Sequence, residues 1–138
     1  MRENIAVNKK NKALMVFDSP EFHEAGYDYR EEFRKVDWKT ESRVYKTLCD
    51  LGYEVKVLGI QGDIHILIDY IVTIKPDIIF NLVEVFKGRS KLEKNIPLVY
   101  ELLDFPYTGA TPENLLICNN KALSKKILSY HHIRVPNF

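Results

Sequence analysis

The stretch KPDIIFNLVE, residues 75–84, decides the fold of this chain. Ile78, Ile79 and Phe80 form a short, continuously apolar run, which indicates a strand that lies centrally in a parallel sheet. Lys75-Pro76 ends a helix before it, because proline disfavours helical backbone in the preceding residue. The stretch therefore predicts a helix followed by a buried parallel strand, a unit typical of α/β proteins.

The same alternation extends to both sides of this stretch. Apolar runs predict strands at 13–17, 53–58 and 77–82, with a further short strand at or just before Tyr107. Right-handed crossovers then give a doubly wound, mostly parallel sheet flanked by helices, which is a Rossmann-like α/β fold. Periodicity and capping residues predict helices that begin at Asp37, at Asp63, near Asn95, at Thr111 and at Asn119 or Asn120.

Composition is that of one globular domain. The 138 residues carry a formal net charge of +1, so no partner in nucleic acid or at a membrane surface is expected. Residues 1–12 are polar, and we expect a frayed leader there, followed by one domain at 13–138. Because there is no export signal and no apolar stretch of about 20 residues, we expect a cytoplasmic protein.

Several side chains carry predictions of burial. Cys49 and Cys118 lie far apart without CxxC spacing, which predicts two reduced, buried thiols instead of a disulfide or metal pair. Helical periodicity turns Leu51 and Tyr130 toward the core. The four histidines lack zinc-like companions, so no metal site is expected.

Ligands of doubly wound folds bind at the carboxyl ends of the strands. The first such loop, from Asp18 to Arg30, is long, and long loops in compact domains are often functional or mobile. Lys121 falls in the first turn of the last predicted helix, where the helix dipole disfavours a cation unless an anion lies nearby. These positions are therefore the first to inspect for a site.

Three segments follow one another at informative separations. They are FNLVE at 80–84, PYTG at 106–109, and NK at 120–121 followed by Lys125 and by VP at 135–136. In this order they resemble the N-terminal half of D-alanine–D-alanine ligases and related ATP-grasp carboxylate–amine ligases. The resemblance covers residues 77–138 well, and the earlier residues only in their strand–helix pattern. It implies a substrate-side domain that precedes the ATP-grasp domain, a pre-ATP-grasp domain.

The resemblance also implies roles for individual residues, although no catalytic residue is assigned. Lys121 matches a lysine that reaches the phosphates of ATP, and a solvated surface lysine is the alternative. Glu84 follows the buried strand, where it either binds an ammonium group or orients Arg89, or else is a solvated loop acid. The PYTG segment either contacts substrate or forms only a tight turn. The substrate-binding candidates are Glu84, Arg89, Tyr107, Thr108 and Gly109.

Two features depart from the family pattern. Asn120 stands where many members have aspartate, which keeps a helix cap but removes a negative charge. The first loop lacks the glycine-rich turn and the glutamate that holds the first amino acid in D-alanine ligases. Asp18, Glu21 and Glu24 are possible replacements, and a merely charged surface loop is the alternative. Substrate identity therefore does not carry over.

The resemblance implies a complete enzyme in which ATP phosphorylates a carboxylate, an amine displaces the phosphate, and Mg²⁺ neutralises charge. This chain reaches Phe138, where the central ATP-grasp domain would begin, so we expect it to be inactive alone and to bind neither ATP nor Mg²⁺ tightly. The expected partners are an ATP-grasp lobe in cis or in trans and a small amino-acid-like substrate. Surface normally covered by that lobe could also pair two chains as a homodimer.

A function of a different class is the alternative hypothesis. The chain would then be a freestanding Rossmann-like binding or regulatory module without ligase activity. Its ligand would be neither a dinucleotide nor a P-loop nucleotide, because no GxGxxG follows the first strand and no GxxxxGK[ST] occurs in the sequence.

Overall fold

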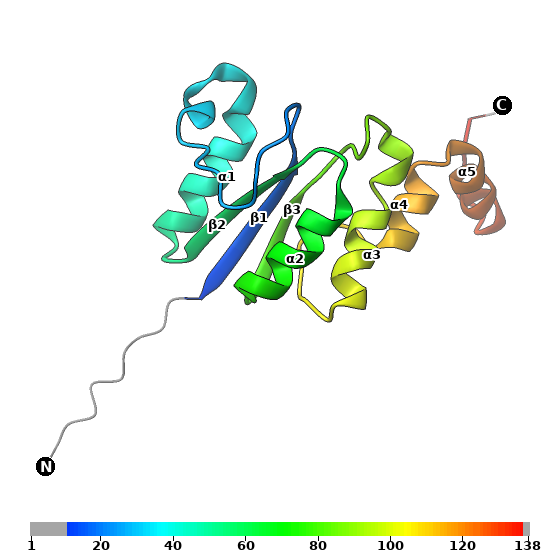
Figure 1. Ribbon diagram of the computed structural model, residues 1–138. Helices are drawn as coiled ribbons and strands as arrows, with labels where there is room; N and C mark the ends of the chain where they lie inside the picture. Colours follow the sequence, from blue (N-terminus) through cyan, green and yellow to red (C-terminus); the bar gives the residue numbers. More distant parts are fainter. Residues whose placement is uncertain (1–10, 137–138) are drawn as a thin grey trace, which may run out of the picture.

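The computed structural model describes residues 11–136, which form a parallel sheet with helices on both faces (Figure 1). The strands are β1 Lys12–Asp18, β2 Glu54–Ile60 and β3 Ile78–Leu82, in the order β2-β1-β3. Both pairings are parallel, so the predicted Rossmann-like α/β class is confirmed. The first ten residues of the predicted leader lie outside the described residues, and β1 begins at Lys12.

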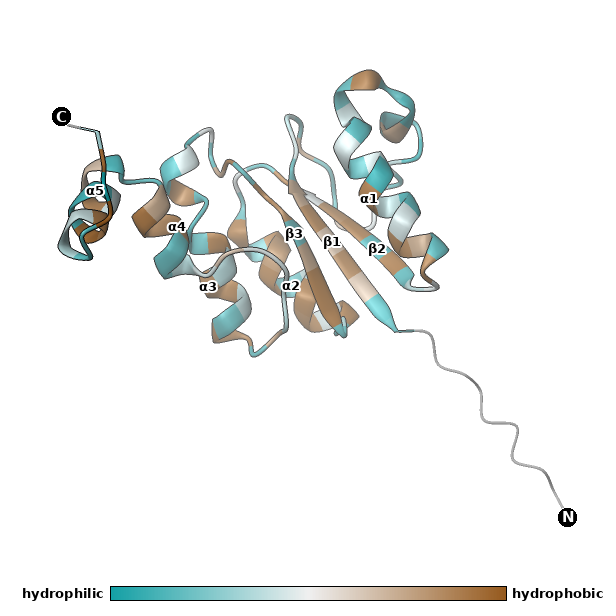
Figure 2. Cartoon of the chain, turned by 180° about the vertical axis from the view of Figure 1, so that it is seen from behind, coloured by the Kyte–Doolittle hydropathy of each residue, from teal (hydrophilic) through white to brown (hydrophobic). Residues whose placement is uncertain are grey.

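The helices divide between the two faces of the sheet. α1 lies on one face, whereas α2 and α3 lie on the other, and α4 and α5 extend beyond the β3 edge (Figures 1 and 2). Three short 3₁₀ turns precede α1 and α3, at Glu32–Arg34, Val36–Trp38 and Ser90–Leu92. The helices are α1 Lys39–Asp50, α2 Ile64–Ile74, α3 Asn95–Leu102, α4 Pro112–Cys118 and α5 Lys121–Tyr130.

The core forms around β1, whose residues from Ala13 to Phe17 are fully buried. Because side chains alternate along a strand, Leu14 and Val16 pack toward α2 and α3, while Met15 and Phe17 pack toward α1 and the loop before it. Figure 2 shows the strands as largely hydrophobic. Burial on both faces explains why the strand is continuously apolar in sequence.

The sheet is less extended beyond β3 than the sequence predicts. The fourth strand is reduced to one parallel bridge between Ile79 and Tyr107, formed by hydrogen bonds from the Ile79 N–H to the Pro106 carbonyl and from the Thr108 N–H to the Ile79 carbonyl. Proline has no N–H to extend this ladder. The central position predicted for β3 belongs to β1, and Ile78 and Phe80 are only partly buried.

Three of the predicted helix caps are confirmed. The side chains of Asp63, Thr111 and Asn120 each accept a hydrogen bond from a backbone N–H in the first turn of α2, α4 and α5. The predicted cap at Asp37 is wrong, because Asp37 lies inside a 3₁₀ turn and α1 begins two residues later, at Lys39. The residue before α1 is Trp38, whose side chain packs on Phe17 instead of capping the helix.

The predicted burial of four side chains is wrong. Cys49 and Cys118 are free thiols, but both are exposed. Leu51, which follows α1, is 69% exposed, and Tyr130, the last residue of α5, is 80% exposed. Within residues 11–136, no helix is long and apolar enough to cross a membrane.

Candidate functional site

A cleft of about 400 Å³ opens at the carboxyl ends of β1 and β3. The chain leaves β1 toward α1 on one face of the sheet and leaves β3 toward α3 on the other. This divergence makes the cleft a topological switch point, where open α/β sheets bind their ligands. Its wall consists of Asp18, Asp37, Thr40, Glu41, Asn81, Leu82, Val83, Glu84, Glu93, Gly109, Ala110 and Leu115.

The cleft is strongly acidic. Its wall contains the carboxylates of Asp18, Asp37, Glu41, Glu84 and Glu93, and it contains no lysine, arginine or histidine. Such a concentration of negative charge attracts a cationic group. In the described part of the chain, no three His, Cys, Asp or Glu side chains are arranged to hold a metal ion. The wall of the cleft therefore favours a positively charged group.

One hydrogen bond joins the two strand ends that form the cleft. The Glu84 N–H donates to Asp18 Oδ1 over 2.8 Å. Ser19, which follows Asp18, donates its N–H to the Ile60 carbonyl over 2.8 Å. The Glu84 carboxylate makes no ion pair with any residue from 11 to 136. Glu84 thus offers an exposed carboxylate on a backbone that Asp18 holds in place.

A buried tyrosine supports the β3 side of the cleft. The Tyr100 hydroxyl, at the fully buried end of its side chain, donates to Asn81 Oδ1 over 3.0 Å. The Asn81 N–H in turn donates to Thr108 Oγ1 over 3.2 Å. Burial raises the pKa of Tyr100 far above its ordinary value, so the hydroxyl stays protonated and remains a donor.

Only some of the predicted substrate-binding residues line the cleft. Glu84 and Gly109 line the cleft together, and Thr108 lies behind it as the acceptor for Asn81. Tyr107 instead donates its hydroxyl to Glu101 over 2.6 Å, and burial together with this bond raises the pKa of Tyr107 to about 12. Arg89 closes a backbone bridge with Phe86, and its side chain is not part of the cleft wall. Among residues 11–136, no ion pair joins Glu84 to Arg89.

Comparison with known proteins gives three matches of one kind. A D-alanine–D-alanine ligase of Aquifex aeolicus is 28% identical over 109 residues, and one of Pelotomaculum thermopropionicum is 30% identical over 109 residues. One of Moorella thermoacetica is 25% identical over 105 residues. The chain is related to the N-terminal domain of D-alanine–D-alanine ligases.

The matches cover much of this chain but little of each ligase. They include 76–79% of this chain and 32–35% of the relatives, so the chain spans about a third of the length of the curated ligases that it matches. No protein-family model matches the chain, and no solved structure gives a significant match.

The residue that the ligase resemblance relates to ATP lies in a second, basic pocket. Lys121 begins α5, and Lys91 and Lys94 face the same pocket of about 540 Å³ with Asn119 and Asn120. Glu93, in the wall of the acidic cleft, accepts a long hydrogen bond of 3.5 Å from Asn119. The acidic cleft and the basic pocket are therefore neighbours of opposite charge.

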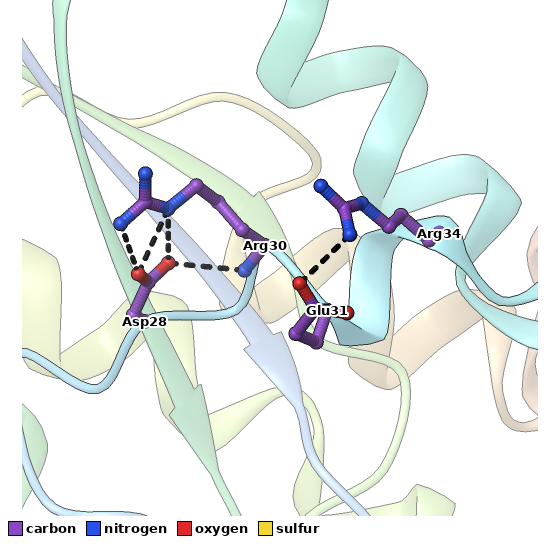
Figure 3. Close-up of polar contacts among 4 residues, drawn as sticks. All are labelled: Asp28, Arg30, Glu31 and Arg34. Carbon is purple, nitrogen blue, oxygen red and sulfur yellow. Dashed lines mark hydrogen bonds and ion pairs between the residues drawn. The ribbon is translucent and has the colours of Figure 1, made fainter.

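Most of the first loop is exposed, with Ser19 and Tyr29 as its buried residues, and only Asp18 of this loop lines the cleft. Of its three candidate acids, Asp18 lines the cleft, and Glu21 and Glu24 do not. Asp28 pairs with Arg30, and Glu31 pairs with Arg34, on the exposed surface (Figure 3). Exposed pairs such as these contribute little to stability, because solvent screens the two charges.

Outside the FNLVE segment, the sequence-based site prediction missed four polar residues of the cleft wall, namely Asp37, Thr40, Glu41 and Glu93. Asp37 was interpreted only as a helix cap, and the others lie outside the segments that carry the ligase resemblance. Their position depends on how α1 and α3 pack against the sheet. No local pattern signals that packing, so sequence spacing could not identify these residues.

Proposed function

We propose that this chain is the substrate-side domain of an ATP-dependent carboxylate–amine ligase similar to D-alanine–D-alanine ligases. The observation that carries the proposal is the acidic cleft at the switch point of the sheet, which provides carboxylates for the ammonium group of an amino-acid-like substrate. The three ligase relatives support the same assignment. The cleft would bind and orient the substrate, while the phosphoryl donor approaches from outside it.

The basic pocket fits the phosphates of ATP. Lys121, Lys91 and Lys94 supply positive charge, and the first turn of α5 supplies free N–H groups. Bound ATP would activate a substrate carboxylate as an acylphosphate, which an amine would displace to form an amide. Lys121 would hold the phosphate beside the cleft, with its positive charge offsetting the charge that develops on the phosphate oxygens.

We propose that the adenine pocket and the Mg²⁺ ligands lie in an ATP-grasp lobe, in cis or in trans, because the matched region covers only 32–35% of each relative. Its contact surface would be α4 and α5, neither of which contains a buried residue. Leu116, Leu128 and Ile133 leave 38–53% of their surface exposed there. Without the lobe, this surface would pair two chains at high concentration.

Phosphate release from ATP tests the proposal. It would be measured for the 138-residue chain and for the protein extended through an ATP-grasp lobe, with a panel of amino acids that includes D-alanine. We expect release by the extended protein alone, and a loss of at least tenfold on Lys121→Ala, because a phosphate contact by a charged group contributes about 1.5–3 kcal/mol. The matched control is Lys126→Ala, since Lys126 is exposed on α5 and does not line the basic pocket.

Two results would contradict the proposal. Binding of ATP without release by the extended protein would favour the freestanding binding or regulatory module. Equal losses on Lys121→Ala and Lys126→Ala would remove the specific role of the basic pocket. Light scattering tests the lobe surface separately, because a strict monomer at high concentration would argue against an apolar contact face on α4 and α5.

A further inference from the structure

The side-chain amide of Asn81 is held from inside the core. Its Oδ1 accepts the hydrogen bond from Tyr100, a residue with no exposed surface, and its backbone is tied to Thr108. If the amide turned over, its NH₂ group would face the Tyr100 hydroxyl and the hydroxyl proton would lose its acceptor. A buried donor without a partner costs about 1–3 kcal/mol, so the observed orientation is strongly preferred.

The other end of the amide faces solvent. Within residues 11–136, Asn81 Nδ2 makes no hydrogen bond, and it is not among the buried side-chain atoms that lack a partner. Since Asn81 lines the acidic cleft, its NH₂ group is available to a ligand there. It is a side-chain N–H donor in a wall whose charged groups are all acceptors.

We propose that Asn81 is a substrate-binding residue whose NH₂ group donates to a carboxylate or carbonyl oxygen of the substrate, and that Tyr100 is the positioning residue that holds the amide in this orientation. The inference rests on the proposed function of the cleft. A donor beside several carboxylates lets the cleft distinguish an amino acid, which carries both an ammonium group and a carboxylate, from a simple amine. The roles of both residues follow from the contacts of Asn81 with the core and with the cleft.

Two probes separate the two halves of this recognition. D-alanine carries an ammonium group and a carboxylate, whereas ethylamine carries the ammonium group alone. The 138-residue chain would be titrated with each probe, and binding would be followed by the NMR signals of the Asn81 side-chain NH₂ and of the backbone amides around Glu84. We expect both probes to shift the Glu84 region and D-alanine alone to shift the Asn81 side chain.

The variants test positioning directly. Tyr100→Phe should weaken D-alanine binding about 3–10-fold, the loss of one hydrogen bond, and leave ethylamine binding unchanged. Asn81→Asp replaces the donor with an acceptor of the same shape, so it should weaken D-alanine binding more than tenfold and strengthen ethylamine binding. Tyr53→Phe is the control for hydroxyl removal, because Tyr53 precedes β2 at the opposite end of the sheet.

The outcomes distinguish this inference from the function on which it rests. If both variants bind D-alanine like the wild type, or lose both probes equally, the inference is wrong and the cleft remains an ammonium site. If neither probe shifts the signals around Glu84, the inference and the substrate role of the cleft both fail. Should Tyr100→Phe not fold, the opposite effects expected of Asn81→Asp on the two probes decide alone.

Discussion

Replacing Gly59 with alanine should displace Tyr29 and loosen the loop that joins β1 to α1. A Cβ at residue 59 would lie 2.3 Å from the Tyr29 hydroxyl oxygen, about 1.1 Å inside the 3.4 Å at which ordinary contact begins, and 2.9 Å from Ser19 Cβ. The Tyr29 ring cannot easily retreat, because it packs against Phe17 and Trp38 at centroid distances of 5.1 Å and 5.9 Å. The clash must therefore move the loop or the strand.

The expected cost is that of overpacking a core, about 1–3 kcal/mol of the free energy of unfolding. Urea denaturation followed by circular dichroism measures it, and the midpoint should fall without a change in slope. Gly62→Ala is the matched control, because its Cβ would meet the flexible side chain of Lys87 at 3.2 Å. That control should change stability by less than about 0.5 kcal/mol.

A second substitution checks the mechanism. The Tyr29 hydroxyl is buried without a hydrogen-bond partner, so Tyr29→Phe alone should be nearly neutral. Combined with Gly59→Ala it removes the closest contact and leaves Ser19 Cβ at 2.9 Å and the ring carbon at 3.0 Å, so part of the lost stability should return. An unchanged midpoint for Gly59→Ala, or no recovery in the double variant, would refute the idea that this contact anchors the loop.

Three further predictions concern pH, capping and charge. The free energy of unfolding should fall as the pH rises from 10 to 12. Tyr107 has a raised pKa of about 12 in the folded state, so its hydroxyl stays protonated there while the unfolded state loses the proton. Tyr107→Phe should make the fall shallower when urea denaturation is measured at each pH. Thr111→Ala should cost about 1 kcal/mol by removing the cap of α4, whereas Thr47→Ala, inside α1, should cost less in the same assay. Glu84→Gln should weaken ethylamine binding several-fold in an NMR titration, and this loss should be smaller at high salt, where charges are screened. Glu54→Gln, at the far end of β2, should have no effect.

Local sequence predicted much of the fold because its signals act over a few residues. The caps at Asp63, Thr111 and Asn120 depend on a side chain and the N–H groups of the next turn, and all three form as predicted. Asp37 had the same chemistry but lies in a 3₁₀ turn, because Trp38 is packed against the sheet. Tyr130 followed the helical period but remains exposed, since α5 packs mainly on α4.

The sequence by itself determined the α/β class, the strand and helix order, and the position of Glu84 and Gly109 near the ligand edge of the sheet. Apolar runs, caps and parallel crossovers are sufficient for those conclusions. Only the tertiary structure decided that Asp37, Glu41 and Glu93 join Glu84 in one acidic cleft, and that Tyr100 holds Asn81 from the core. These groups come from separate elements, and their meeting depends on long-range packing that no local pattern encodes.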